Sequence, residues 1–258
     1  MSHAGYIDFH CHLDDPCFDG ERWRIIDECV ASGFSRLVTV ADAYDEKSLE
    51  RTTEMLDYHA IMAATAGAHP HGADGYTPAI ENRLLAFLDR CPVLAVGEVG
   101  LDFHYHLAAR ANQEAVFRRQ VAIARERSLP LVIHSRKAEE LVLKILADEK
   151  FALPVVFHCY TGDAASAAEI AARGYLLSFS GIITFKKADE LRAIVAVAPR
   201  ESVLSETDSP YLAPEPGRGR TNTPLAVMRV AHKIAEIREI EVAELLAEVA
   251  RNFQRLQR

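Results

Sequence analysis

Eight short apolar segments alternate with segments of helical periodicity along a chain of 258 residues. Within these segments, apolar and polar residues do not alternate as in a sheet with one solvent-exposed face, which favours strands buried on both faces. The predicted strands are residues 6–9, 36–40, 61–66, 93–96, 131–133, 154–157, 175–179 and 203–205. Strict alternation of strand and helix over this length predicts an α/β fold, a TIM (β/α)8 barrel in a single domain covering residues 1–258.

The segments between and after these strands have helical spacing, and several carry residues that start or stop a helix. Asp45 is a candidate N-cap, Pro78 suits a first helical turn, and Gly33 and Gly174 favour helix ends. The predicted helices are residues 21–31, 46–59, 78–90, 113–127, 138–149, 164–173, 187–197, 225–238 and 242–257. No internal repeat or linker divides the chain into further domains.

An open doubly wound sheet is the alternative arrangement of these elements. Polar residues follow several predicted strands, and in an open sheet only the strands beside the switch point would bring such residues together, whereas in a barrel all of them meet. No glycine-rich phosphate loop of the GxGxxG type follows any predicted strand, which weakens a nucleotide-binding interpretation. These features favour the barrel.

Charge and cysteine content limit the class of protein. The formal net charge of -8 disfavours a general nucleic-acid coat protein, which is normally basic, but allows an enzyme that holds phosphate through a metal ion. The five cysteines are odd in number and form no CxxC pair, which predicts reduced thiols and a cytoplasmic protein. No apolar stretch approaches a membrane span, so we expect no membrane partner. Nothing indicates an oligomer interface, and a monomer is the default expectation.

Metal-ligand side chains stand at the ends of six of the eight predicted strands. His10 and His12 are one residue apart, so in an extended backbone both imidazoles project to the same side. Each residue alone has an ordinary alternative, because His-x-His pairs also occur in surface loops and isolated carboxylates cap helices. Their recurrence at corresponding points predicts a shared site for one or two divalent cations, Mg²⁺, Mn²⁺ or Zn²⁺. The candidates are His10, His12, His69, His71, Glu98, Asp102, His134, His158, Glu206 and Asp208.

Eight stretches, in the same order along the chain, resemble the motifs of the TatD family of metal-dependent deoxyribonucleases, which belongs to the amidohydrolase superfamily of barrels. They are residues 7–13 (IDFHCHL), 67–71 (GAHPH), 96–102 (VGEVGLD), 129–136 (LPLVIHSR), 156–162 (VFHCYTG), 180–186 (SGIITFK), 206–212 (ETDSPYL) and 218–224 (RGRTNTP). Ala68 and Tyr160 are conservative variants of the family pattern, and the region of Tyr105 and His106 departs from it. None of these departures removes a candidate ligand.

The resemblance implies which candidates bind metal and what they do. The implied ligands are His10, His12, Glu98, His134, His158 and Asp208. Glu98 stands where many amidohydrolases place a carboxylated lysine that bridges two metals, which implies a bridging role. The expected reaction is hydrolysis of a phosphodiester by a water molecule whose pKa is lowered by a bound ion. Asp208 is the candidate general base, with a purely structural ligand role as the alternative, and Glu206 and Asp102 are expected to orient ligands from behind.

Several side chains are candidates for substrate contacts, because guanidinium and ammonium groups match phosphate oxygens. They are His69, Arg136, Lys186, Arg218 and Arg220. For each cation a solvated surface charge is the alternative, and Lys186 has the strongest case because it ends the matched stretch 180–186.

The expected partner is DNA, short or single-stranded, since the chain is acidic and has no long basic groove. The family resemblance implies 3′-to-5′ exonuclease action, and the residues alone do not decide between DNA and RNA. The alternative is a hydrolase of the same superfamily acting on an amide, lactone or other ester, which would need neither Lys186 nor the basic residues of the 218–220 loop. A binding protein without catalysis is disfavoured because every candidate ligand is present.

Overall fold

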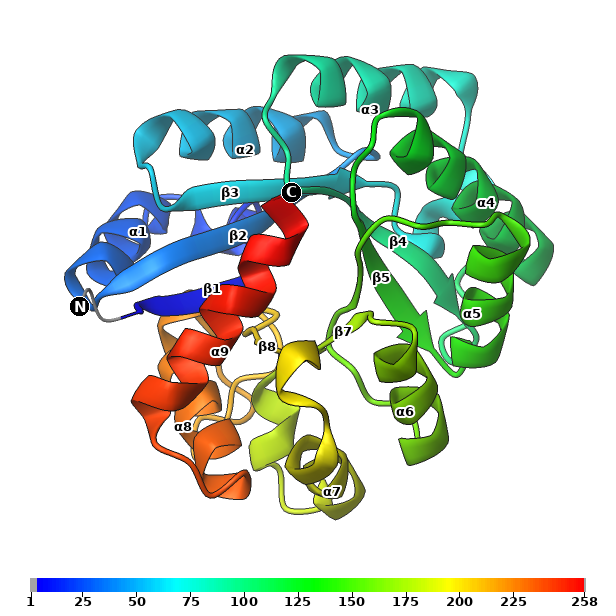
Figure 1. Ribbon diagram of the computed structural model, residues 1–258. Helices are drawn as coiled ribbons and strands as arrows, with labels where there is room; N and C mark the ends of the chain where they lie inside the picture. Colours follow the sequence, from blue (N-terminus) through cyan, green and yellow to red (C-terminus); the bar gives the residue numbers. More distant parts are fainter. Residues whose placement is uncertain (1–3, 258) are drawn as a thin grey trace.

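Eight parallel strands follow one another in sequence order around a nearly closed barrel with helices outside it (Figure 1). The structure is a computed structural model that describes residues 4–257. The strands are β1 (Tyr6–Cys11), β2 (Phe34–Asp42), β3 (Met62–Gly67), β4 (Ala95–Asp102), β5 (Leu131–Arg136), β6 (Val155–Phe157), β7 (Leu176–Phe179) and β8 (Val203–Ser205). The TIM barrel predicted from the alternation of strands and helices is thereby confirmed.

The helices surround the strand barrel close to the predicted positions. They are α1 (Arg22–Ala31), α2 (Glu46–Tyr58), α3 (Pro78–Arg90), α4 (Arg110–Glu126), α5 (Glu139–Asp148), α6 (Ala164–Ala172), α7 (Asp189–Val197), α8 (Val227–Ile237) and α9 (Val242–Gln254). Asp45 caps α2 by accepting a hydrogen bond from the Lys47 N–H, and Pro78 occupies the first turn of α3, as expected. None of the helices described here is both long and apolar enough to cross a membrane.

β4 differs from its predicted position. Residues 93–96 were expected to form it, but the strand begins at Ala95 and continues to Asp102. Gly97 and Gly100 were interpreted as part of the segment after the strand, yet they mark a close approach between backbones. A Cβ atom on Gly100 would lie 2.0 Å from the His134 carbonyl oxygen of β5, and φ at Gly100 is +141°. The glycines therefore keep β4 paired with β5 where a polar residue, Glu98, enters the barrel.

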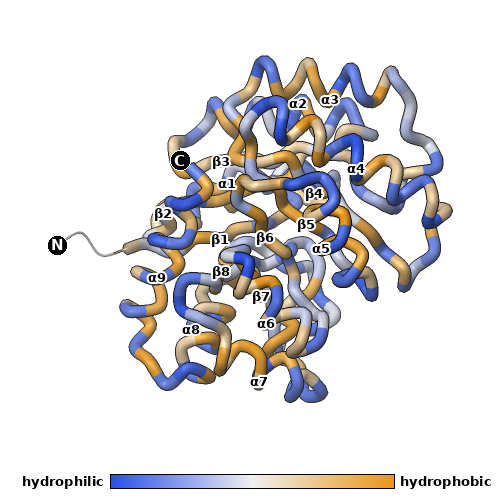
Figure 2. The backbone as a smooth tube through the Cα atoms, turned by 45° about the vertical axis from the view of Figure 1, so that its right-hand side comes forward, coloured by the Kyte–Doolittle hydropathy of each residue, from blue (hydrophilic) through white to orange (hydrophobic). Residues whose placement is uncertain are grey.

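The strands are buried on both faces, as their continuous apolar composition predicts. Every residue of β4, β6, β7 and β8 is buried. Figure 2 shows hydrophobic segments concentrated in the strands, whereas the outer helices alternate between hydrophilic and hydrophobic turns.

The last helix covers the amino-terminal end of the barrel. In Figure 1, α9 lies across the barrel beside β1 and β8. Phe253 of α9 meets Phe9 of β1 edge to face with ring centroids 6.3 Å apart. The Asn252 side chain donates hydrogen bonds to the carbonyls of Arg200 and Val203, at the start of β8. This packing leaves the carboxyl-terminal end of the strands as the open mouth of the barrel.

The first and last strands are joined mainly through side chains and through backbone bonds beyond the strand ends. Asp8, a buried carboxylate within β1, accepts hydrogen bonds from the backbone N–H and the hydroxyl of Thr207 at 2.8 and 2.6 Å. The Asp208 N–H donates to the His10 carbonyl, and the His12 N–H donates to the Ser209 carbonyl. These bonds bring the segment after β8 against the end of β1.

Candidate metal centre

A local irregularity in strand pairing shapes the end of β1. Asp8 pairs with Leu37 and Cys11 pairs with Thr39, so three steps on β1 match two on β2. One extra residue in a strand makes a bulge, which bends the strand and redirects a side chain. His10 lies within this bulge.

The same irregularity occurs in β4. Val96 pairs with Leu131 and Val99 pairs with Ile133, so β4 also carries one extra residue, and Glu98 lies within it. Both bulges stand beside the mouth of the barrel. They bring His10 and Glu98 close together, since the His10 Nε2 atom is 3.4 Å from Glu98 Oε2.

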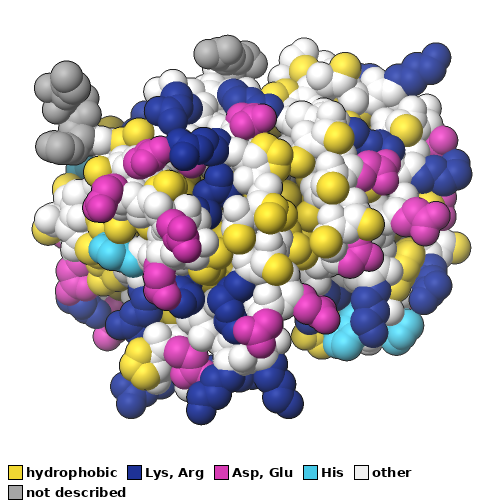
Figure 3. Space-filling view, turned by 60° about the horizontal axis from the view of Figure 1, so that its bottom comes forward, with side chains coloured by type: hydrophobic (Ala, Val, Ile, Leu, Met, Phe, Trp, Pro, Cys, Tyr) yellow, Lys and Arg dark blue, Asp and Glu magenta, His cyan; other side chains and the backbone are white. Residues whose placement is uncertain are grey.

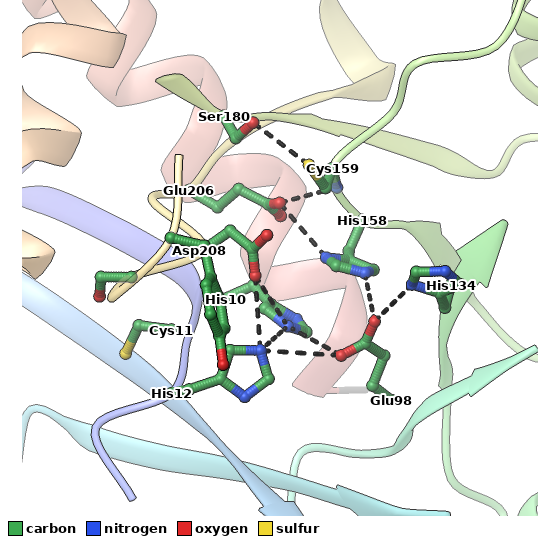
Figure 4. Close-up of polar contacts among 12 residues, drawn as sticks. His10, Cys11, His12, Glu98, His134, His158, Cys159, Ser180, Glu206 and Asp208 are labelled. Carbon is green, nitrogen blue, oxygen red and sulfur yellow. Dashed lines mark hydrogen bonds and ion pairs between the residues drawn. The ribbon is translucent and has the colours of Figure 1, made fainter. Parts of the chain in front are cut away.

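Three residues from the two joined ends of the barrel form a first cluster of metal-ligand atoms. The Nε2 atoms of His10 and His12 are 3.3 Å apart. Asp208 Oδ1 lies 3.4 Å from His12 Nε2 and 3.9 Å from His10 Nε2. Glu98 Oε2 completes the group at 3.8 Å from His12 Nε2 (Figure 4).

The other oxygen of Glu98 faces a second cluster. Glu98 Oε1 lies 2.7 Å from His134 Nδ1 and 2.6 Å from His158 Nε2. His69 Nε2 is 3.3 Å from the same oxygen. The two oxygens of one buried carboxylate thus face different imidazoles, which suits a residue that would contact two cations.

Outer carboxylates hold the imidazoles of the second cluster. Asp102 Oδ2 lies 3.0 Å from His134 Nε2 and 2.9 Å from His71 Nε2. Glu206 Oε1 lies 3.4 Å from His158 Nδ1 and accepts a hydrogen bond from the Cys159 N–H. A carboxylate behind a ligating imidazole fixes its tautomer and ring orientation. The structure therefore places Asp102 next to His134 and His71, and Glu206 next to His158.

The donor set fits one or two divalent cations. The candidate donor atoms form three groups, each with all its donor atoms within 4.8 Å of one another. Two of these groups share His10, namely His10–His12–Asp208 and His10–Glu98–His158, and the third is His69–His71–His134. Imidazole nitrogens suit Zn²⁺ and Mn²⁺, and the carboxylate oxygens also admit harder ions such as Mg²⁺. The His10 ring stacks on the His158 ring with centroids 3.9 Å apart. Burial and the neighbouring His158 lower the pKa of His10, which favours the neutral form that binds metal.

Electrostatic interactions within the centre favour ionised carboxylates. Burial raises the pKa of Glu98, but the adjacent His158 and His69 outweigh it and hold this pKa well below its usual range. Burial lowers the pKa of His12, whereas the hydrogen bond and charge of Asp208 raise it, to about 9. The metal-free centre thus carries a proton on His12 at neutral pH.

This proton predicts a pH-dependent metal affinity. A cation must displace it, so binding below about pH 9 should release at least one proton, and affinity should rise about tenfold per pH unit. In the metal-free protein, the His12–Asp208 pair stabilises the fold fully below pH 6.5 and this stability is lost as pH rises through about 9. Calorimetric titration with Mn²⁺ in buffers of different protonation enthalpy measures the proton count. A binding enthalpy independent of the buffer would contradict this prediction.

Asp102→Asn should weaken metal binding without removing a ligand. The substitution takes away the charge that orients His134, and such changes typically cost about 10- to 100-fold in metal affinity. The expected result is a fall of that size in Zn²⁺ affinity, measured by competition with a chelating dye. Asp89→Asn is the matched control, because Asp89 is an exposed residue of α3 whose ion-pair partner among residues 4–257 is Arg127. Equal affinities for the two variants would rule out the orienting role of Asp102.

The candidate substrate contacts divide into two groups. His69 and Arg136 line a cavity of about 660 Å³ at the mouth of the barrel, together with His12, Glu98, His134, His158 and Asp208. His10 is fully buried and does not line this cavity. The Arg136 guanidinium donates a hydrogen bond of 2.8 Å to the Thr161 hydroxyl within this cavity. Lys186, Arg218 and Arg220 are exposed and do not line it. The Arg218 guanidinium instead lies over the Phe185 ring, 4.4 Å from its centroid.

Cysteines next to the ligands are placed by packing rather than by the cation clusters. Cys11 is fully buried, donates to the Val38 carbonyl at 3.2 Å, and points away from the histidines in Figure 4. Cys159 lines the cavity, with its sulfur 3.3 Å from the Ser180 hydroxyl. All five cysteines are free thiols, as their odd number and spacing predicted.

Sequence reasoning overlooked two contributors to the site. Asp8 joins the barrel ends and so places Asp208 opposite His10 and His12, and a lone acidic residue inside an apolar strand was the available signal. Thr161 holds Arg136, and its place in the matched stretch 156–162, three residues after His158, was the available signal.

The sequence model of the family described as TatD related DNase matches residues 7–258. The chain belongs to the TatD family. YabD of Bacillus subtilis, named an uncharacterized metal-dependent hydrolase, is 35% identical over 251 residues, covering 97% of this chain and 98% of the relative. A protein of Cronobacter sakazakii named 3'-5' ssDNA/RNA exonuclease TatD is 32% identical, covering 97% of both chains. The crystal structure of YJJV, a TatD homolog from Escherichia coli K12, matches with a TM-score of 0.90 at 26% identity over 97% of each chain.

Membership of the TatD family confirms the resemblance drawn from the eight sequence motifs. It also establishes this chain as a metal-dependent hydrolase, which is the class that the imidazole and carboxylate clusters predict. The barrel of a TatD homolog carries the same arrangement of elements, so the fold is confirmed independently.

Proposed function

We propose that this TatD-family hydrolase is a nuclease that cleaves phosphodiester bonds of short or single-stranded DNA or RNA from one end, in the 3′-to-5′ direction. The observation that carries the proposal is the composition of the mouth cavity. Two candidate cation clusters bridged by Glu98 share it with Arg136, a guanidinium that can hold a phosphate oxygen. The name of the Cronobacter relative supports the same substrate class and direction.

The residues at the mouth of the barrel have different proposed roles in catalysis. His10, His12, Glu98, His134, His158 and Asp208 are the proposed metal ligands, for one or two ions of Mg²⁺, Mn²⁺ or Zn²⁺. Bound ions would lower the pKa of a water molecule and neutralise negative charge on the phosphodiester. Arg136, held by Thr161, would orient a phosphate oxygen, and His69 stands beside Glu98 where it can contact the same group.

Asp208 is the proposed proton acceptor. Burial raises its pKa, but the hydrogen bond from His12 and the His12 charge outweigh this and lower the pKa below its usual range. The carboxylate is therefore ionised at neutral pH and lies beside both candidate ligands of β1. An ionised carboxylate at a metal centre can take the proton from the attacking water.

The surface is consistent with a short or single-stranded substrate. On the face shown in Figure 3, Lys and Arg side chains are interspersed with Asp and Glu side chains and form no continuous basic band. The formal net charge is -8, so long-range attraction of a duplex is not expected. We expect the protein to act in the cytoplasm, where its five free thiols stay reduced.

A substrate panel tests the proposal. The protein, loaded with Mg²⁺, Mn²⁺ or Zn²⁺, is given fluorescent DNA and RNA oligonucleotides, bis-p-nitrophenyl phosphate, and simple carboxylic esters, lactones and amides. We expect cleavage of the oligonucleotides, with Arg136→Ala raising KM for them more than it lowers kcat. Turnover restricted to carboxylic esters, lactones or amides would overturn the nuclease assignment and favour the alternative hydrolase. The placement of Lys186, Arg218 and Arg220 outside the cavity makes this comparison necessary.

A further inference from the structure

The mouth cavity has a strongly uneven charge distribution. Four aspartates from the segment after β1, the last position of β2 and the segment after β2 line one side of it, and we call them the acidic wall. They are Asp14, Asp15, Asp42 and Asp45. Arg136 and Thr161, from the ends of β5 and β6, line the same cavity. Because the strands follow one another in order around the barrel, the segments after β1–β2 and after β5–β6 face each other across the metal centre.

The charge of the acidic wall is not neutralised by lysine or arginine side chains. Within residues 4–257, none of the four aspartates forms an ion pair with Lys or Arg. The nearby cations Arg22 and Arg51 pair with Asp19 instead and reach the wall only through backbone carbonyls. A phosphate entering this side of the cavity therefore meets carboxylates that no lysine or arginine side chain compensates.

One carboxylate oxygen of the acidic wall, Asp14 Oδ1, lacks a hydrogen-bond donor among the described residues. Asp14 is only 8% exposed. Its Oδ2 atom accepts a 2.6 Å hydrogen bond from the Ser48 hydroxyl, whereas its buried Oδ1 atom has no partner among the described residues. A buried carboxylate oxygen without a partner is costly, so a local shift that let a ligand hydroxyl or amino group reach Asp14 Oδ1 would stabilise the complex.

Two members of the wall also cap helical turns, but capping does not explain their charge. Asp15 accepts from the Cys17 N–H, and Asp45 accepts from the Lys47 N–H. Asparagine caps a helix about as well as aspartate does. Capping therefore does not require the negative charge at these two positions, and this charge adds to the negative potential of the cavity.

An aromatic surface stands beside the acidic wall. Tyr211 is 55% exposed, lines the cavity, and meets the His12 ring edge to face with centroids 6.0 Å apart. An exposed ring at this position offers a stacking surface for a nucleobase.

We infer that the acidic wall receives the terminal nucleoside of the substrate and rejects any further phosphate, so that a strand enters only from the Arg136 side. The inference rests on the proposed nuclease function and assigns specificity to the four aspartates. The hydroxyl and amino groups of an uncharged terminal nucleoside donate to the wall, its base stacks on Tyr211, and a terminal phosphate is repelled. The enzyme then acts on ends with a free hydroxyl and leaves circular strands intact.

End chemistry tests the inference on the wild-type protein. Oligonucleotides of one sequence carry a hydroxyl or a phosphate at the 3′ end and, separately, at the 5′ end, and a circular form of the same strand is included. At the end that the enzyme attacks, we expect kcat/KM to be at least about tenfold higher for the hydroxyl than for the phosphate. The circular strand should not be cleaved.

A double variant then assigns the preference to the wall. Asp15→Asn combined with Asp45→Asn removes two charges and keeps both caps, and should lower the hydroxyl-over-phosphate ratio by about tenfold. The control is Asp57→Asn combined with Asp163→Asn, which has the same charge change. Asp163 caps α6, Asp57 is exposed on α2, and neither lines the cavity, so both rates should stay unchanged.

The outcomes separate this inference from the proposed function. If no oligonucleotide is cleaved under any condition, the nuclease proposal itself fails. If the wild type cleaves hydroxyl ends, phosphate ends and circles equally well, or prefers phosphate ends, the nuclease proposal stands and the role of the wall is refuted. An unchanged ratio in the folded double variant also refutes it. Should that variant not fold, the wild-type ratio alone decides.

Discussion

Glu98→Gln should nearly abolish turnover while leaving the barrel folded. The substitution conserves size but replaces one oxygen with an NH₂ group, which cannot bind a cation, so the carboxylate no longer serves both clusters. Metal ions at such centres contribute several kcal/mol of transition-state stabilisation, which corresponds to about 10³-fold or more in kcat. We expect that loss together with a fall in metal content to less than about half of the wild-type value. Turnover on an oligonucleotide and elemental analysis of the purified variant measure the two quantities.

The matched control for this substitution is Glu50→Gln, at an exposed position of α2. It should retain wild-type metal content and turnover. Circular dichroism and thermal melting report whether the Glu98 variant keeps its fold. Wild-type metal content and rate in a folded Glu98→Gln protein would show that the residues assigned to the centre are wrong.

Asp208→Asn should affect turnover more than metal binding. His10, His12 and Glu98 remain as donors of the first cluster, whereas the only proposed proton acceptor is lost. We expect kcat to fall by about 10²–10⁴-fold, the usual contribution of a general base. Asparagine is the appropriate replacement because φ at Asp208 is +55°, and Asn tolerates this left-handed conformation better than most residues.

The measurement for Asp208→Asn is the pH dependence of kcat at saturating Mn²⁺. The variant should lose the acidic limb that the wild-type carboxylate produces. Asp74→Asn serves as the control, since Asp74 is an exposed aspartate whose partners in the described part of the chain are the Ala109 N–H and the Asn112 side chain. Full recovery of turnover at high metal concentration would show that Asp208 is only a ligand, the alternative that sequence reasoning left open.

Local rules predicted the fold well, and they also selected the candidate ligands. Apolar segments without polar alternation marked the strands, and caps such as Asp45 and Pro78 marked helix starts, because these signals depend on a few neighbouring residues. The six candidate ligands are brought together because the strand ends of any such barrel share one volume. The limits of β4 were wrong because Gly97 and Gly100 serve a contact with β5 that is distant in sequence.

The sequence did not predict which of the candidate cations line the cavity. Lys186 was favoured by its position in a matched stretch, yet it is exposed and outside the cavity, and Arg136 is inside. The path of a long loop over the rim depends on its packing against other loops. Neither composition nor motif order contains that information.

Strand alternation, ligand-type residues at strand ends and motif order are properties of the linear chain, and they determined the barrel, the TatD family and the metal-dependent chemistry. Only the tertiary structure decided how the candidate ligands and the charged residues of the cavity are arranged relative to one another. Bulges of one residue in β1 and β4 set His10 and Glu98 face to face, and closure through Asp8 placed Asp208 beside them. Barrel geometry also set four aspartates across the cavity from Arg136. These features depend on contacts between residues far apart in sequence, whose energies no local pattern encodes.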